Sequence, residues 1–146
     1  RVPTIMWAPG RIPAGTETSE IAATIDLLPT IAKISGAKLN PRGTIDGVDI
    51  YNLIHGKGKS PRSEFLYYSR DGKIEGLRQG EWKLRVSNNR NEKPATLELY
   101  NLVEDIAERV NLAKQHPSKV VSLAKRMREL DTAISKDIRL RGRLDK

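Results

Sequence analysis

The sequence predicts an α+β fold, in which a small antiparallel sheet of about four strands is packed by a C-terminal helix and preceded by a strand and a helix. Four short runs with strand character, separated by turn residues, lie between residues 64 and 101. A long amphipathic pattern then begins at Pro117. Hydrophobic period and composition change near Gly56 to Arg62, so we expect one structural unit over residues 1–58 and a second over residues 59–146.

The composition is that of a globular protein without cysteine chemistry. Of the 146 residues, 38% are hydrophobic and 30% are charged, and no apolar run approaches the roughly 20 residues that span a bilayer. The absence of cysteine excludes disulfides, thiolate nucleophiles and cysteine-ligated zinc. The chain opens directly on the strand-like run RVPTIMW, without an initiator methionine or a signal-peptide pattern. We therefore expect a fragment of a longer protein.

The net charge of +8 is concentrated in the second half of the chain. Residues 1–58 contain 6 Lys and Arg against 5 Asp and Glu, whereas residues 59–146 contain 20 against 13. A basic half of this kind could bind a polyanion such as nucleic acid or a sulfated glycan. We favour a solvated helix face, because basic residues opposite an apolar stripe are typical of amphipathic helices. A polyanion-binding module stays as an alternative.

The first unit is expected to contain a strand and a helix. Arg1 to Gly10 is apolar on both faces of an extended chain, which predicts a strand inside a covered sheet. In TIDLLPTIAKISG, Asp26 reads as the N-cap of a helix that ends at Gly36 in the left-handed conformation. The apolar positions Leu27, Leu28, Ile31 and Ile34 recur at helical spacing. A long connector follows, with a short helical piece at Ile50 to Ile54.

The second unit shows a change of period. Strands are predicted over residues 64–70, 73–79, 81–87 and 95–101, with hairpin signals at Asp71-Gly72 and Gly80-Glu81. A helix should start at Pro117 and cover one face of the sheet. Its apolar stripe is expected to comprise Val120, Val121, Ala124, Met127, Leu130 and Ile134.

No residue pattern identifies an active site. The run His55 to Ser60 resembles a phosphate loop only in part, because Leu53 stands where the Walker pattern requires glycine. His55 and His116 lack further ligands at zinc spacing, and the Asp46 and Asp49 region lacks the remaining ligands of a calcium loop. The strand aromatics Tyr67, Tyr68, Trp82 and Tyr100 are more simply packing residues than a stacking surface.

The order of the segments resembles the C-terminal part of the type I sulfatases. The resemblance covers essentially the whole chain and rests on RVPTIMWAPGRIPAGT, ATIDLLPTIAKISGAKLN, IDGVDIYNLIHGK, SPRSEFLYY, GLRQGEWKLRV and LELYNLVEDIAERVNLAKQHP. One departure is Ile106-Ala107, where relatives commonly have Pro-Gly before the Glu. The resemblance implies the alkaline-phosphatase-like superfamily. Residues 1–58 would then be the end of a large α/β domain, and residues 59–146 a small subdomain of sheet and helix.

The resemblance also implies sulfate ester hydrolysis by the parent protein. Sulfatases use a formylglycine, made from the Cys or Ser of a C/S-x-P-x-R motif, and a calcium ion. These residues lie upstream of the segment that resembles Arg1-Val2-Pro3. We therefore expect neither catalytic nor metal-binding residues in this chain, and no activity of the chain alone. A fragment of a related phosphatase or phosphonate monoester hydrolase is a further alternative.

The resemblance suggests substrate contacts and partners. The polar run SNNRNEKP corresponds to a loop at the pocket rim of relatives, so Asn89 and Arg90 are expected to contact a sulfated small molecule or glycan. The upstream catalytic domain would be a partner, whereas neither nucleic acid nor a membrane is expected. Val2, Ile5, Trp7 and the Leu28/Ile31 face of the predicted helix should seek partners, so self-association of the chain is possible.

Overall fold

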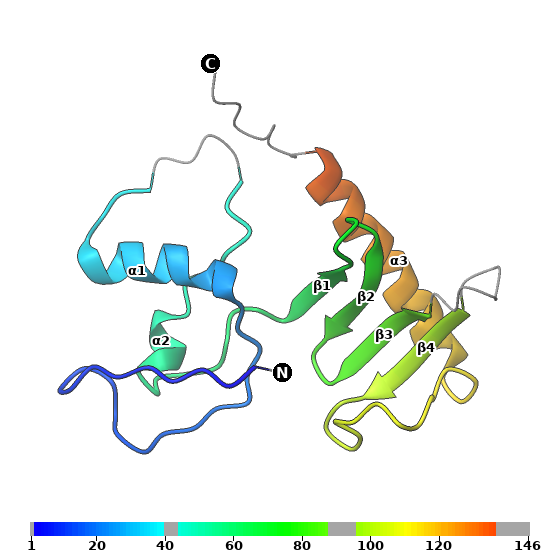
Figure 1. Ribbon diagram of the computed structural model, residues 1–146, viewed down its shortest axis with the longest axis horizontal. Coiled ribbons are helices and arrows are strands. Elements are labelled where there is room, and N and C mark those ends of the chain that lie inside the picture. Colours follow the sequence, from blue (N-terminus) through cyan, green and yellow to red (C-terminus); the bar gives the residue numbers. More distant parts are fainter. Residues whose placement is uncertain (1, 40–43, 88–95, 137–146) are drawn as a thin grey trace. The chain divides into compact units, whose positions relative to one another are not determined.

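The computed structural model describes residues 2–39, 44–87 and 96–136 (Figure 1). The chain divides into two compact units, Arg1–Ser63 and Glu64–Lys146. This division falls a few residues after the predicted boundary. The assignment of the two parts to a large and a small domain stays a prediction.

The second unit contains the antiparallel sheet. Within the described residues the sheet has the order β1-β2-β3-β4, and each strand pairs with the next one along the chain. Helix α3, Pro117–Lys136, follows and lies along one face (Figure 1). This confirms the predicted meander and C-terminal helix. The strands are β1 Glu64–Tyr68, β2 Ile74–Gln79, β3 Trp82–Ser87 and β4 Thr96–Asn101.

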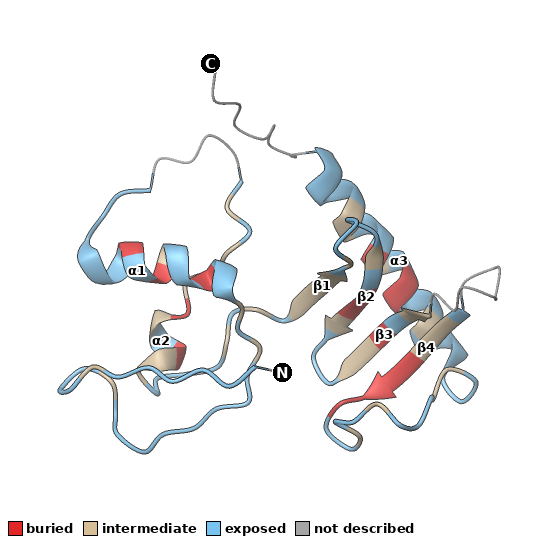
Figure 2. Ribbon diagram, viewed as in Figure 1, coloured by how far each residue is buried: buried red, intermediate tan, exposed pale blue. Residues whose placement is uncertain are grey.

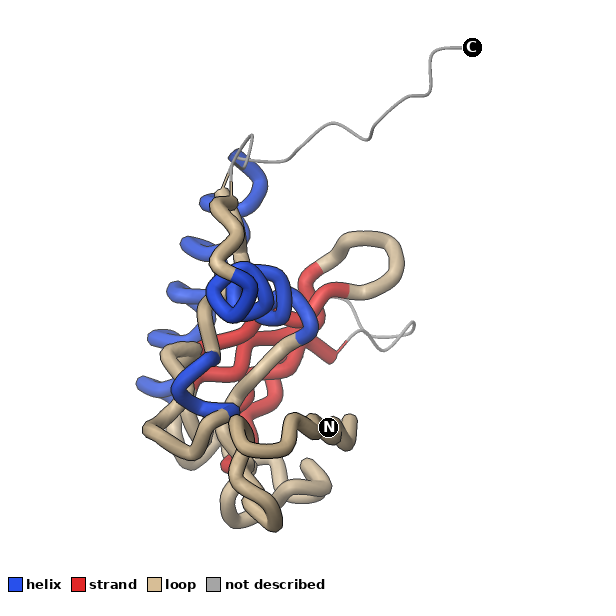
Figure 3. The backbone as a smooth tube through the Cα atoms, turned by 90° about the vertical axis from the view of Figure 1, so that its left-hand side faces the viewer, coloured by secondary structure: helices blue, strands red, loops and turns tan. Residues whose placement is uncertain are grey.

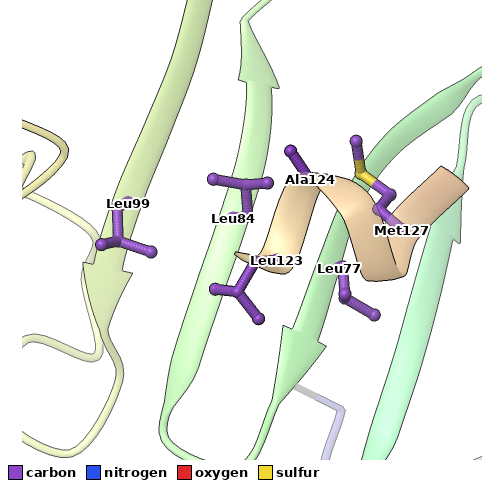
Figure 4. Packing of buried hydrophobic residues seen from close by; sticks show 6 residues of the cluster. All are labelled: Leu77, Leu84, Leu99, Leu123, Ala124 and Met127. Carbon is purple, nitrogen blue, oxygen red and sulfur yellow. The ribbon is translucent and has the colours of Figure 1, made fainter. Parts of the chain in front are cut away.

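A row of leucines crosses the sheet and forms its core. Leu77 of β2 stands opposite Leu84 of β3, which stands opposite Leu99 of β4, and all three side chains are fully buried. From α3, Leu123, Ala124 and Met127 pack onto this row (Figure 4). Because side chains alternate between the faces of a strand, a register slip of one residue would move a leucine of the row to the other face.

The predicted stripe of α3 differs from the structure at three residues. Val121 is 67% exposed and Ile134 is 39% exposed, whereas Leu123, which the stripe omitted, is 1% exposed. Successive helical residues differ by about 100° around the axis. Val120 packs against the core, so the side chain of the next residue, Val121, points away from the sheet. Leu123 lies one turn from both Val120 and Met127 and takes the central position.

The segment after β4 closes the outer edge of that strand. The Leu112 N–H donates to the Leu99 carbonyl at 2.8 Å, and the Leu99 N–H donates to Asn111 Oδ1 at 3.1 Å. Earlier in this segment Glu108 has a φ of +54°, and its carboxylate accepts a hydrogen bond from Lys83 Nζ at 2.5 Å. The turn thus places a non-glycine residue, Glu108, in the left-handed region.

The first unit has three short helical segments among its described residues. A 3₁₀ turn at Thr24–Asp26 leads into α1, Leu27–Ser35, and α2 spans Tyr51–Ile54. Helix α1 ends as predicted at Gly36, whose φ is +71°, and the Ala37 N–H donates to the Ala32 carbonyl at 2.9 Å. This pair of features is a Schellman-type C-terminus.

The predicted strand over Arg1 to Gly10 does not form. Residues 2–8 belong to no helix or strand, and Val2, Ile5 and Trp7 are 87%, 94% and 84% exposed. A strand exists only when a neighbouring strand pairs with its N–H and C=O groups. The described residues offer this segment no such neighbour. Its apolar sequence therefore remains exposed.

Candidate functional site

Asp26 is the acidic residue that the sequence singles out, and it is fully buried in the first unit. Its Oδ2 accepts a hydrogen bond from the Ala23 N–H at 2.8 Å, and its Oδ1 accepts one from the Val48 N–H at 2.9 Å. The Arg62 guanidinium holds both carboxylate oxygens, with Nε 3.1 Å from Oδ1 and 2.9 Å from Oδ2. Arg62 Nη2 makes a further short contact with Oδ1.

The predicted N-cap role of Asp26 is wrong. Its backbone is already helical, with φ −76° and ψ −14°, and its side chain makes no cap hydrogen bond to α1. The carboxylate instead turns back to the Ala23 N–H, the contact that a third-position acid makes in a capping box. A 3₁₀ turn precedes α1, so the first helical hydrogen bonds begin one turn earlier than the spacing indicated.

The carboxylate of Asp26 is held in its charged form. Burial, the largest influence, raises its pKa, but hydrogen bonds from Arg62 and from the Val48 and Ala23 amides together outweigh it. The pKa therefore lies below its ordinary value of 3.8. With donors from Ala23, Val48 and Arg62 directed at it and no exposed surface, this carboxylate is a structural anchor and not a base that substrate could reach.

The anchor fixes the connector against α1. Arg62 Nη2 also donates to the Asp46 carbonyl at 2.8 Å. Thr30 Oγ1 donates to the Asp26 carbonyl at 2.6 Å and accepts from the Ile50 N–H at 3.0 Å. At Gly47 a Cβ atom would stand 2.1 Å from the Ile25 carbonyl oxygen, so only glycine allows this approach. Arg62 was missed in the sequence because it lies 36 residues from Asp26, beyond any periodic signal.

The other polar residues considered in the sequence have local structural contacts. His55 Nδ1 lies 2.7 Å from the Tyr51 carbonyl oxygen, and the imidazole ring of His55 stacks on the ring of Tyr51 with 4.0 Å between the ring centroids. His116 packs against Trp82 at 5.2 Å, and its carbonyl accepts the Val120 N–H at the start of α3. Asp49 accepts hydrogen bonds from Lys33 Nζ at 2.6 Å and from the Tyr51 N–H.

The described residues contain no group of three or more His, Asp or Glu side chains that could hold a metal ion. They also contain no helix long and apolar enough to cross a membrane. Asn89 and Arg90, the predicted substrate contacts, lie outside the described residues. Their connection starts from Ser87 and returns at Thr96, two residues that pair at one end of the sheet.

Helix α1 exposes its large apolar side chains. Leu28 and Ile31 are 56% and 58% exposed, and Leu27 and Ile34 also reach the surface. The residues of α1 that are buried are Thr30 and Ala32. Most of the helix is accordingly drawn as exposed in Figure 2. In this unit, then, the small and polar side of the helix faces inward and its large apolar side faces outward.

Solved structures share this fold. A protein solved with its substrate D-glucosamine-2-N,6-O-disulfate superposes with a TM-score of 0.65 and 22% identity, over 88% of this chain and 27% of that one. The PsFucS1 sulfatase from Pseudoalteromonas sp. gives a TM-score of 0.61 with 19% identity, over 77% of this chain and 26% of that one. The chain therefore shares its fold with part of each of these proteins.

The chain belongs to the family described as N-sulphoglucosamine sulphohydrolase, C-terminal, whose model matches residues 1–135. A sulfatase of Formosa agariphila is 31% identical over 100% of this chain and 27% of its own length. Human arylsulfatase A is 44% identical over 57% of this chain and 17% of its own length. The chain therefore spans only about a quarter or less of these relatives.

We expect the loss of Arg62 to destabilise the first unit. In Arg62→Ala, Asp26 would be left as a buried charge without its partner, a change that typically costs about 3–5 kcal/mol. The matched control is Arg85→Ala, which breaks the more exposed Arg85–Glu98 pair of the second unit and should cost about 1 kcal/mol or less. Amide hydrogen exchange at Val48 and Ile50 measures the local stability of the first unit in both variants. An equal loss of protection at these two amides in both variants would contradict the role of Arg62 as an anchor.

The same pair predicts a dependence of stability on pH. Because the pKa of Asp26 is lower in the folded chain than in the unfolded chain, its stabilisation is fully present above pH 3.8 and is lost as the pH falls through the folded-state pKa. Asp26→Asn should remove this contribution to the acid dependence of amide exchange. An unchanged acid dependence in that variant would show that Asp26 is not the group responsible.

Proposed function

We propose that the protein to which this chain belongs hydrolyses sulfate esters, and that the chain is its C-terminal, non-catalytic part. The family match over residues 1–135 carries this proposal, because it includes residues of both units. The similarity to a sulfatase over the whole chain supports it. The substrate class that we propose is a sulfated small molecule or glycan.

The sequence lacks the motif for the formylglycine implied by the resemblance, and the described residues do not fit the implied calcium ion. The chain contains no cysteine, and its Ser-Pro run KSPRS lacks the spacing of C/S-x-P-x-R. The described residues form no cluster that would hold the metal. We place both groups in the remainder of the protein and assign no chemical step to the residues described here.

Asn89 and Arg90 are proposed as substrate-binding residues at the pocket rim. Strands β3 and β4 pair as far as Ser87 and Thr96, so the two described residues that flank this run lie together at one end of the sheet. A guanidinium can bind a sulfate or carboxylate through two parallel hydrogen bonds, and an amide side chain can donate to and accept from sugar hydroxyls. Both side chains therefore suit the organic part of a sulfated saccharide.

The upstream catalytic domain is the proposed partner of the exposed α1 face. Leu28 and Ile31 are neighbours on one helix face at i, i+3 spacing and are more than half exposed. The relatives are several times longer than this chain, so additional protein is available to cover such a face. Its burial would remove two large side chains from water, at about 1.5–3 kcal/mol for each fully buried side chain.

Activity should require the whole protein. We expect the full-length protein to release sulfate from p-nitrophenyl sulfate or from a sulfated saccharide, and the chain of residues 1–146 to release none. Sulfate release is measured by ion chromatography, with p-nitrophenyl phosphate as the comparison substrate. Hydrolysis of the phosphate ester alone would indicate the phosphatase alternative. Tight, salt-sensitive binding of heparin by the isolated chain without hydrolysis by the whole protein would favour the polyanion-binding alternative.

Arg90 should influence which substrate is preferred. In the full-length protein, Arg90→Ala should lower kcat/KM by about tenfold for substrates that it contacts, as expected for a lost hydrogen bond to a charged group. Arg90→Lys should restore only part of this because it keeps the charge without the fork of donors. Arg109→Ala, another arginine of the second unit, is the control. Specificity constants that are unchanged across substrates would remove this proposal.

The α1 face should tolerate charge only when the rest of the protein is absent. The double variant Leu28→Glu, Ile31→Glu should leave the isolated chain folded and reduce any self-association, but should lower the Tm of the full-length protein because unpaired charges would be buried. Val121→Glu, at an exposed position of α3, should change neither. An unchanged Tm of the full-length double variant would contradict the docking proposal. If the full-length wild type forms dimers and the double variant does not, the partner of this face is a second copy of the protein.

A further inference from the structure

The turn between β1 and β2 presents two cations on a well-defined backbone. Arg70 and Lys73 are both exposed, and both belong to the turn of residues 69–73. The Ser69 N–H donates to the Lys73 carbonyl at 2.8 Å, the Gly72 N–H donates to the Ser69 carbonyl at 3.0 Å, and the Lys73 N–H donates to Ser69 Oγ at 3.1 Å. Gly72, with φ +75°, permits this closed turn.

Neither cation is neutralised within the described part of the chain. Arg70 and Lys73 form no ion pair there, whereas Lys83 is paired with Glu108 and Arg85 with Glu98 in the same unit. Asp71 is also exposed, so the turn carries two positive charges and one negative charge. Its two basic side chains are therefore available to an anion from outside.

The pairing of the strands places this turn beside the start of the β3–β4 connection. Gly76 of β2 pairs with both Tyr67 of β1 and Arg85 of β3. From this row, β2 runs back to Ile74 and the turn, and β3 runs forward to Ser87 on the same side of the row. The turn and Ser87 therefore lie at the same end of the sheet. A bulge between Tyr67 and Tyr68 shifts the register there, and bulges bend a hairpin. Figure 3 shows the turn as a tan loop that projects from the strands on the side away from α3.

We propose that Arg70 and Lys73 form an anion-binding subsite for a polyanionic sulfated saccharide. They would bind a second sulfate or a carboxylate of the substrate, apart from the sulfate ester that is hydrolysed. This inference rests on the proposed function, because it takes the end of the sheet at Ser87 and Thr96 as the end that faces substrate. The guanidinium of Arg70 offers a fork of donors to the anion, and Lys73 adds a point charge.

The test uses the full-length protein with p-nitrophenyl sulfate as the reporter and hexasaccharides from heparin and from carrageenan as competitors. Arg70→Ala and Lys73→Ala should each raise the inhibition constant of the better competitor by about two- to fivefold, the range expected for an exposed ion pair. Asp71→Asn should lower that constant, because it removes the repelling carboxylate. The kcat and KM for the reporter, which has no second anion, should stay unchanged.

Arg109→Ala is the matched control, because Arg109 is an exposed cation in the segment that follows the opposite end of β4. An equal effect of Arg109→Ala, or no inhibition of the wild type by either hexasaccharide, would overturn the subsite. If the wild type does not hydrolyse the reporter, the proposed function fails separately. In that case the same variants are compared by calorimetric titration with the hexasaccharides. Weaker binding by Arg70→Ala and Lys73→Ala, but not by Arg109→Ala, supports the subsite. Binding by all variants as tight as that of the wild type overturns it.

Discussion

The buried ion pair of Asp26 and Arg62 joins α1 to the connector in the first unit. Among the described residues of that unit, Asp26 and Thr30 are fully buried, and the buried apolar side chains are Ala32, Ile50 and Leu53. Replacing one member of a buried ion pair is costly, but the intact pair contributes little net stability, because desolvation offsets most of the attraction. Its effect is to specify one arrangement, in which the connector runs along α1.

The second unit is held together in the opposite way. Its leucine row is covered by α3, and its ion pairs lie at the margins of that core. Glu64 of β1 and Arg126 of α3 form one such pair, and the hydrogen bond from Arg126 lowers the pKa of Glu64. Here the apolar faces of sheet and helix cover each other. In the first unit, by contrast, α1 directs Thr30 and Ala32 inward and its large apolar residues outward.

The sequence was informative where a short-range pattern decides the structure. Alternation and turn signals located all four strands within two residues of their ends, and Gly36 and Pro117 marked helix ends correctly. Patterns failed where distant residues decide. The sequence around Asp26 indicated a cap because nothing local reveals that Arg62 and Val48 reach it, and Arg1 to Gly10 has the composition of a strand without the neighbour that a strand requires. The prediction that Asn89 and Arg90 contact substrate came from family resemblance alone, since a polar run of sequence has no hydrophobic period that would indicate its role.

The hydrogen bonds of Leu99 have a consequence for how the sheet can grow. A strand from another molecule that approached β4 would meet backbone and side-chain groups of Leu112 and Asn111 already occupying the donor and acceptor of Leu99. These two hydrogen bonds would have to break before the incoming strand could pair with Leu99. At this edge, therefore, the polypeptide acts as its own terminating strand, and aggregation by sheet extension would begin with local unfolding of the segment after β4.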